Sequence, residues 1–288
     1  MPRHEPRAAQ SVTIYTSTDP LQFAFGVCAV LAIACWVLSV LSGNYSWVDR
    51  LWSIAPMLYT CHFAARAGFA DARLNLMAGL VGLWGVRLTY NFARKGGYRW
   101  TGEDYRWPEL QRILGPVGFQ VLNATFGAPY QNLLLLLITL PAYVAWQAQG
   151  APLNGIDAVA AAVFLGLLAG EAVADEQQWR FQCAKQAAKV RGNAVQAEFV
   201  TTGLFRYSRH PNFFCEQAMW WAVYGFAVAA SGAWLNWSIV GTVLLTLLFQ
   251  GSTRLTEAIS LRKYPAYRDY QRTTPMFVPR LLRRHDPL

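Results

Sequence analysis

Charged residues are scarce in this chain of 288 residues, where they make up 14% of the sequence. A soluble domain carries roughly a quarter. The sequence also has no repeat, no low-complexity tract and no boundary between soluble domains. Hydrophobic residues make up 54% of it, and runs such as 20–42 and 132–146 approach the ~20 residues needed to cross a bilayer. The composition therefore argues against a soluble enzyme and favours a polytopic helical membrane protein.

Two familiar site patterns are absent. The GxGxxG fingerprint is missing, which excludes an ordinary Rossmann dinucleotide site but not a site inside a membrane bundle. The cysteines show no paired metal-ligand spacing, so we expect packing roles, no disulfide and no metal site. These cysteines are Cys28, Cys35, Cys61, Cys183 and Cys215.

Apolar segments follow one another at about 20–42, 46–66, 73–93, 127–147, 156–178, 213–231 and 235–260. The net charge is +9, and basic residues gather after the third segment, between the fifth and sixth, and after the last. Basic loops stay on the cytoplasmic side, so this pattern indicates membrane orientation rather than nucleic-acid binding. We expect an all-α bundle of about seven transmembrane helices, with the N-terminus outside and a cytoplasmic, amphipathic C-terminal segment.

Two regions lie outside this apolar pattern. No small-residue cleavage site follows the first apolar run convincingly, so residues 1–19 are predicted to be a tail before a retained helix rather than a removed signal peptide. Residues 96–126 are predicted to be a glycine-initiated loop followed by an interfacial amphipathic helix. That helix is either an anchoring belt at the headgroups or a lid over a site.

Several polar residues lie within the early apolar segments. Asp49 is either a first-turn charge that favours the helix dipole or a carboxyl group in a partly dry cavity that can act as an acid. Trp84, Arg87 and Asn91 share one helix face by spacing, and Tyr90 is expected to join it. Arg87 either points into the bundle or snorkels to the interface.

A polar stripe on the fifth segment contains Glu171, Asp175 and Gln178. The last segment repeats the pattern with Arg254 and Glu257, which are expected to satisfy Glu171 or each other in an ion-pair network. A binding role for these residues is the alternative to that structural role.

The sequence SRHPN at 208–212 is predicted to be a turn, because Pro211 disfavours helical geometry at His210. Asn212 is then a plausible N-cap of the sixth span, with Glu216 one turn inside it. A helix N-terminus beside Arg206, Arg209 and His210 is suited to a phosphate or carboxylate.

The stretch TGLFRYSRHPNFFCEQAMWW at 202–221, with LRKYPAYRDYQRTTPMFVPR at 261–280, resembles the C-terminal domain of the steroid 5α-reductase family, most closely its bacterial branch. Sterol reductases and isoprenylcysteine or phospholipid methyltransferases share the general signature. NYSWVDRLW and RLTYNFARKGGYRWTGEDYRW resemble the N-terminal half of the bacterial branch. The resemblance implies one membrane domain at 20–280, with a substrate-side half at 20–126, a cofactor-binding half at 127–280 and a basic tail at 281–288.

The resemblance also implies NADPH as cofactor and a lipid or steroid-like substrate that enters from the bilayer. Asp49 matches the family's substrate-binding acid, Arg87 a neighbouring arginine, and Tyr90 is the candidate hydroxyl donor because Trp84 holds the usual tyrosine position. The full set expected at the cofactor is Glu171, Asp175, Gln178, Arg206, Tyr207, Arg209, His210, Asn212, Glu216, Arg254, Glu257 and Tyr267.

The expected activity is NADPH-dependent hydride transfer to an activated C=C bond in a membrane, most plausibly a bacterial inner membrane. The main alternative is an S-adenosylmethionine-dependent methyltransferase, because Arg209, His210 and Glu257, with the tyrosines at 264, 267 and 270, also suit that branch. A third class is a non-catalytic lipid-binding or scaffolding protein. The sequence does not determine the oligomeric state.

Overall fold

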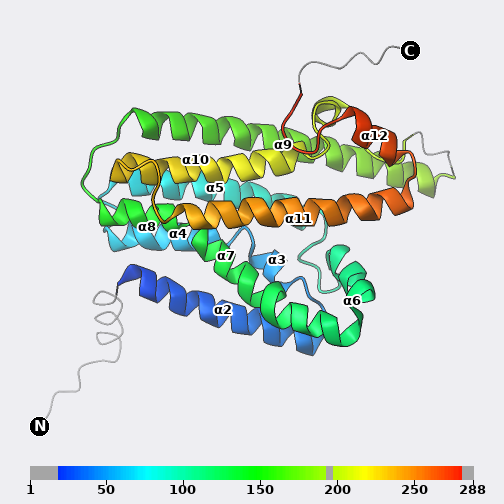
Figure 1. The fold of residues 1–288 in the computed structure, drawn as a ribbon, viewed down its shortest axis with the longest axis horizontal. Helices are drawn as coiled ribbons and strands as arrows, with labels where there is room; N and C mark the ends of the chain where they lie inside the picture. Colours follow the sequence, from blue (N-terminus) through cyan, green and yellow to red (C-terminus); the bar gives the residue numbers. More distant parts are fainter. Residues whose placement is uncertain (1–18, 193–196, 281–288) are drawn as a thin grey trace, which may run out of the picture. The chain divides into compact units, whose positions relative to one another are not determined.

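The computed structural model describes residues 19–192 and 197–280, and every regular element in those residues is helical. The helices (Figure 1) are α2 (Pro20–Ser42), α3 (Trp47–Leu51), α4 (Ala55–Arg66), α5 (Ala72–Arg94), α6 (Arg106–Leu122), the π-helix η1 (Asn123–Tyr130), α7 (Gln131–Leu137), α8 (Leu140–Gln147), α9 (Gly155–Val190), the 3₁₀-helix η2 (Gly203–Arg206), α10 (Pro211–Ser231), α11 (Ile239–Lys263) and α12 (Tyr267–Thr273). The all-α prediction is confirmed for this part of the chain. Except for Asp19, the predicted tails at 1–19 and 281–288 lie outside the described residues.

Four helical stretches of the described residues are long and apolar enough to cross a membrane. They are Pro20–Ser42, Arg106–Gln147, Gly155–Val190 and Ile239–Lys263. Several such helices are the hallmark of a multi-pass integral membrane protein. Helix α2 agrees with the predicted segment at both ends, because the Asp19 carboxylate caps its first turn and Gly43 ends it with φ +65°.

The helices differ from the predicted segments in three places. The segment at 46–66 is two helices, α3 and α4, with a break at 52–54. The predicted amphipathic helix within 96–126 is α6, and Gly115 interrupts it with φ +68° just before Pro116. Helix α9 extends 12 residues past the predicted end at 178. That extension is polar, so hydropathy alone could not place its end.

The described residues form two compact units, and each is described by itself. Unit 1 comprises residues up to 158 and 223–243, and unit 2 comprises 159–222 and the residues from 244 onward. Within unit 1, η1 and α7 run alongside α2, and α4 packs on α5 and α8 (Figure 1). Gly85 permits the close approach to the turn before α4, because a Cβ there would lie 2.8 Å from the Ser53 carbonyl oxygen.

A buried ion pair joins two distant segments of unit 1. The Arg73 guanidinium donates from Nε to Asp157 Oδ1 at 2.8 Å and from Nη2 to Oδ2 at 2.9 Å. It also donates to the carbonyl oxygens of Ala151 and Pro152. The pair therefore fixes the start of α5 to the start of α9 and to the loop before it.

A network of hydrogen bonds holds the loop before α6 against α3, also within unit 1. Arg50 donates to the carbonyl oxygens of Gly97, Arg99 and Gly102, and its guanidinium lies 4.4 Å from the ring centroid of Trp47. The 44–50 and 96–107 segments, which the sequence singled out separately, therefore form one polar assembly.

In unit 2, α10 packs between α9 and α11. Gly170 of α9 faces Cys215 of α10, where an added Cβ would come within 3.1 Å of the sulfur. Phe213 of α10 meets Phe249 of α11 edge to face, with ring centroids 5.1 Å apart. The segment after α12 then pairs with the turn before α10, which positions the candidate site.

Candidate functional site

The turn at 207–210 is held in place by the end of the chain rather than by α10 alone. Backbone N–H groups of Arg209 and His210 donate to the carbonyl oxygens of Pro275 and Met276, at 2.9 and 3.1 Å. The Ser208 hydroxyl also donates to the Met276 carbonyl. The turn predicted at 208–212 is confirmed up to His210, and the C-terminal segment covers it.

Helix α10 begins at Pro211, a residue whose fixed φ suits the first position of a helix. Asn212 therefore lies inside the first turn, and the prediction that it caps the helix is wrong. Its side-chain amide instead donates to Asp175 Oδ1 on α9 at 3.3 Å. The expected proximity of Asn212 and Asp175 is present, but through a side-chain contact between two helices.

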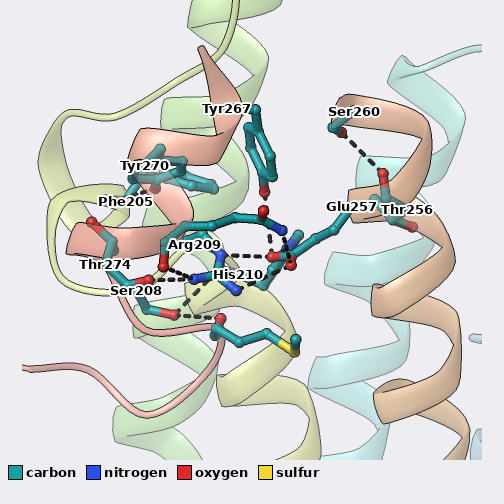
Figure 2. Close-up of polar contacts among 12 residues, drawn as sticks. Phe205, Ser208, Arg209, His210, Thr256, Glu257, Ser260, Tyr267, Tyr270 and Thr274 are labelled. Carbon is teal, nitrogen blue, oxygen red and sulfur yellow. Dashed lines mark hydrogen bonds and ion pairs between the residues drawn. The ribbon is translucent and has the colours of Figure 1, made fainter. Parts of the chain in front are cut away.

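Glu257 is the centre of the polar cluster in Figure 2. Its carboxylate accepts from Arg209 Nε at 2.6 Å and Nη2 at 3.0 Å, a bidentate pair, and lies 3.0 Å from His210 Nε2. The Gln271 amide and the Tyr267 hydroxyl also donate to it, at 2.7 and 3.4 Å. Because the Arg209 and Glu257 side chains are only 8% and 5% exposed, this pair is shielded from water.

The Arg209 guanidinium is engaged on its other edge as well. Its Nη1 donates to the carbonyl oxygens of Gln271 and Thr274. Arg209 therefore ties α11 to α12 and to the segment after it. A phosphate contact from Arg209 stays a prediction, and it would require the guanidinium to leave partners that already surround it.

The ion pair expected between Arg254 and Glu257 is not formed. Arg254 is exposed on α11, whereas Glu257 is buried and bound to Arg209. The sequence suggested Arg254, three residues before Glu257, as a partner. In the fold, Glu257 instead pairs with the guanidinium of Arg209, which lies 48 residues away in the sequence.

Two buried tyrosines complete this cluster on α12. The Tyr267 hydroxyl reaches Glu257, and the Tyr270 hydroxyl donates to the Phe205 carbonyl oxygen. Burial raises the pKa of both phenols above the ordinary value. Both are therefore neutral hydrogen-bond donors at pH 7.

A second group of polar residues lies where α9 faces α10. Glu171 and Asp175 of α9 and Glu216 of α10 are all buried. The Glu216 carboxylate accepts from Trp220 Nε1 at 3.1 Å. Carboxyl groups on facing helices offer hydrogen-bond acceptors there, which suits hydroxyl groups or amides of a ligand.

The remaining cofactor candidates lie at the edge of unit 2. Gln178 is half-buried on α9, and Arg206 is exposed at the end of η2. The Arg206 guanidinium lies 5.9 Å from the ring centroid of Tyr207, and the Tyr207 carbonyl accepts from the backbone N–H of Arg280. Arg206 is thus the basic residue of the predicted turn that faces solvent.

The substrate-side candidates belong to unit 1. The Asp49 carboxylate lies in the first turn of α3 and accepts from Trp107 Nε1 at 3.0 Å. Arg87 is half-buried on α5. Trp84 and Asn91 are buried, but Tyr90 is 65% exposed, so the prediction that Tyr90 shares their face is wrong. The α-helical period places Tyr90 about 100° from Asn91.

Comparison with known proteins gives the family. The sequence profile of a family described as "Protein of unknown function (DUF1295)" matches residues 35–274. The chain belongs to the DUF1295 family. It is also 38% identical over 281 residues to an uncharacterised protein of the yeast Schizosaccharomyces pombe, and the match covers 93% of this chain and 82% of the relative. No solved structure matches it.

In this DUF1295 chain, the predicted residues divide into groups. Arg209, His210, Glu257 and Tyr267 meet in one cluster, and Asp175 meets Asn212. Sequence reasoning missed the Gln271 amide and the Thr274 carbonyl, which complete the first cluster, and the Trp107 indole, which donates to Asp49 in unit 1. Single amides, carbonyls and indoles carry no spacing signal that could have revealed them.

Proposed function

We propose that this DUF1295 protein is an NADPH-dependent membrane reductase that acts on an activated C=C bond of a lipid or steroid-like substrate. The proposal includes a bundle of about seven spans in a bacterial inner membrane, with the N-terminus outside and the C-terminus cytoplasmic. The observation that carries it is the contact between Asp175 and Asn212, beside the buried carboxylates of Glu171 and Glu216.

The side chains present fit a dinucleotide in two ways. Carboxylate oxygens on facing helices accept hydrogen bonds, as ribose hydroxyls and a carboxamide require. Exposed Arg206 and Arg254 supply positive charge for phosphate groups. When bound, the coenzyme would supply a hydride. In this account the chain's own residues hold the coenzyme in place and exclude water from it.

The buried cluster of Arg209, His210, Glu257 and Tyr267 would serve a different purpose in this account. With its donors and acceptors matched inside the chain, it supports the turn that presents Arg206, Tyr207 and Asn212. A rigid supporting shell keeps binding groups in place. Asp49 and Arg87 are proposed as substrate-side groups that bind the conjugated oxygen, whereas the exposed Tyr90 lies off the face formed by Trp84 and Asn91.

One observation favours S-adenosylmethionine, the coenzyme of the methyltransferase alternative. Arg209 of the predicted turn is paired with Glu257, and Glu171, Asp175 and Glu216 are buried along α9 and α10. Buried carboxylates suit a sulfonium or ammonium cation better than a phosphate. The phosphate groups of NADPH favour a positively charged site, whereas the cation of S-adenosylmethionine favours a negatively charged one. A binding experiment with each coenzyme can therefore distinguish the two functions.

Replacing Asn212 tests the proposed dinucleotide site directly. Purified wild-type protein in detergent is titrated with NADPH and the nicotinamide fluorescence is followed. We expect saturable binding, weakened about tenfold in Asn212→Ala, because one hydrogen bond to the coenzyme and the support of Asp175 are lost. Asn75→Ala, which truncates an exposed amide of unit 1, is the matched control and should bind normally. If the wild type binds S-adenosylmethionine but not NADPH, the result contradicts the reductase proposal and supports the methyltransferase alternative.

A further inference from the structure

Two lysines of unit 2 converge on Tyr264, whose backbone carbonyl accepts from the N–H of Tyr267. Lys185 of α9 donates from Nζ to the Tyr264 hydroxyl at 2.9 Å, and its ammonium lies 4.6 Å from the centroid of the same ring. The Lys263 ammonium, at the end of α11, lies 5.4 Å from that centroid. Two ammonium groups from different helices therefore share one phenol.

The positive charge at this point is not balanced by a carboxylate. Neither Lys185 nor Lys263 takes part in an ion pair with any residue in 19–192 or 197–280. Burial alone would raise the pKa of Tyr264, but hydrogen bonds from Lys185 and Lys263 and their charges lower it below the usual value. An anion is the component that would neutralise two such ammonium groups.

Hydrogen-bonding capacity also remains at these groups. An ammonium group carries three N–H donors, and Lys185 uses them on the Tyr264 oxygen and the Glu198 carbonyl. Since the Tyr264 oxygen accepts from Lys185, its own hydrogen can be donated onward. Lys185, Lys263 and Tyr264 therefore each retain a donor for one shared acceptor.

The length of α9 places this site beyond the lipid headgroups. A hydrocarbon core of ~30 Å takes ~20 residues of helix, so a span that begins near Gly155 leaves the core near residue 175. Lys185 then lies about 15 Å further along, whereas the headgroup layer is only about 5–8 Å thick on each side. An average helix tilt of ~20° lengthens the span by only about one to two residues. The anion must therefore come from the aqueous phase.

We propose that Lys185, Lys263 and Tyr264 form an anion-binding site that takes a phosphate group of a water-soluble ligand. The proposal rests on the contacts among these three residues, and it does not depend on which coenzyme unit 2 binds. The competing explanation is a purely structural tie in which Lys185 joins α9 to the α11–α12 connection. That tie accounts for the hydrogen bonds of Lys185, but it predicts no saturable binding of an anion at Lys185 and Lys263.

Lysine-selective ¹³C labelling gives a direct test, because the chain has only four lysines: Lys95, Lys185, Lys189 and Lys263. The wild-type protein in detergent is titrated with inorganic pyrophosphate and the lysine Cε signals are followed by NMR. We expect saturable shifts of the Lys185 and Lys263 signals, with Lys95 and Lys189 nearly unchanged. Equal, non-saturating shifts of all lysines, or none at all, would overturn the proposal.

Matched variants separate direct contact from general electrostatics. Lys185→Gln should weaken pyrophosphate binding about tenfold, whereas Lys189→Gln, which removes the same charge one turn further along α9, should change it less than twofold. Equal losses in both variants would contradict a defined site. In nanodiscs, anionic phosphatidylglycerol in place of phosphatidylcholine should leave the Lys185 signal unmoved, and a shift there would assign the site to lipid.

Discussion

Glu257→Gln is expected to destabilise the protein by about 3–5 kcal/mol. The change keeps the size of the side chain but removes its charge, so the Arg209 guanidinium stays buried without a counter-ion. Breaking a buried ion pair from one side costs about this much, because the remaining charge has lost both water and its partner. His210, Tyr267 and Gln271 lose a charged acceptor at the same time.

Thermal unfolding in detergent, followed by circular dichroism, measures this loss. Glu176→Gln is the control, because it breaks an exposed pair with Arg180 and should cost less than about 0.5 kcal/mol. The double change Arg209→Met with Glu257→Leu should recover much of the stability, since well-packed apolar residues can replace a buried pair. An unchanged unfolding temperature in Glu257→Gln would mean that this cluster does not hold the C-terminal segment in place.

Arg73→Met is expected to cost a similar amount in unit 1, about 3–5 kcal/mol. It leaves the Asp157 carboxylate buried without its bidentate partner, and it frees the carbonyl oxygens of Ala151 and Pro152. The Asp157 carboxylate keeps only local donors such as the backbone N–H of Asn154. The start of α9 would therefore loosen from the start of α5.

The same unfolding assay tests Arg73→Met, with Arg112→Gln as its control. Arg112 forms an ion pair with Glu109 in unit 1, but its side chain is 62% exposed, so its loss should cost at most about 1 kcal/mol. Equal effects of the two changes would show that the Arg73 pair is not shielded from water in the folded protein.

The ends of a helix could be predicted where the limits of an apolar run coincide with a capping residue or a terminating glycine. Helix α2 is uniformly apolar between a capping aspartate at 19 and a left-handed glycine at 43, so both of its ends follow from the sequence. Where polar residues enter a helix, hydropathy no longer marks its end. The polar stripe on the fifth segment indicated that α9 continues past residue 178, but its end at Val190 was not predicted, and the break at Gly115 in α6 was missed.

The candidate site was only partly predictable, because helix spacing reports neighbours on one helix and not partners across helices. The sequence singled out Arg209, His210 and Glu257, which meet in one cluster, but the partner it offered for Glu257 was Arg254 on the same helix. The actual partner lies on a turn 48 residues away. The Arg73–Asp157 pair spans 84 residues and was not anticipated at all. Such pairs follow from the tertiary fold.

The identity of the coenzyme tests the central claim most directly. The full chain is purified in mild detergent, and the small molecules released on denaturation are identified by mass spectrometry. The account predicts a nicotinamide dinucleotide phosphate in the wild type and much less of it in Asn212→Ala. Release of S-adenosylmethionine or its demethylated product, with no dinucleotide, would contradict the account.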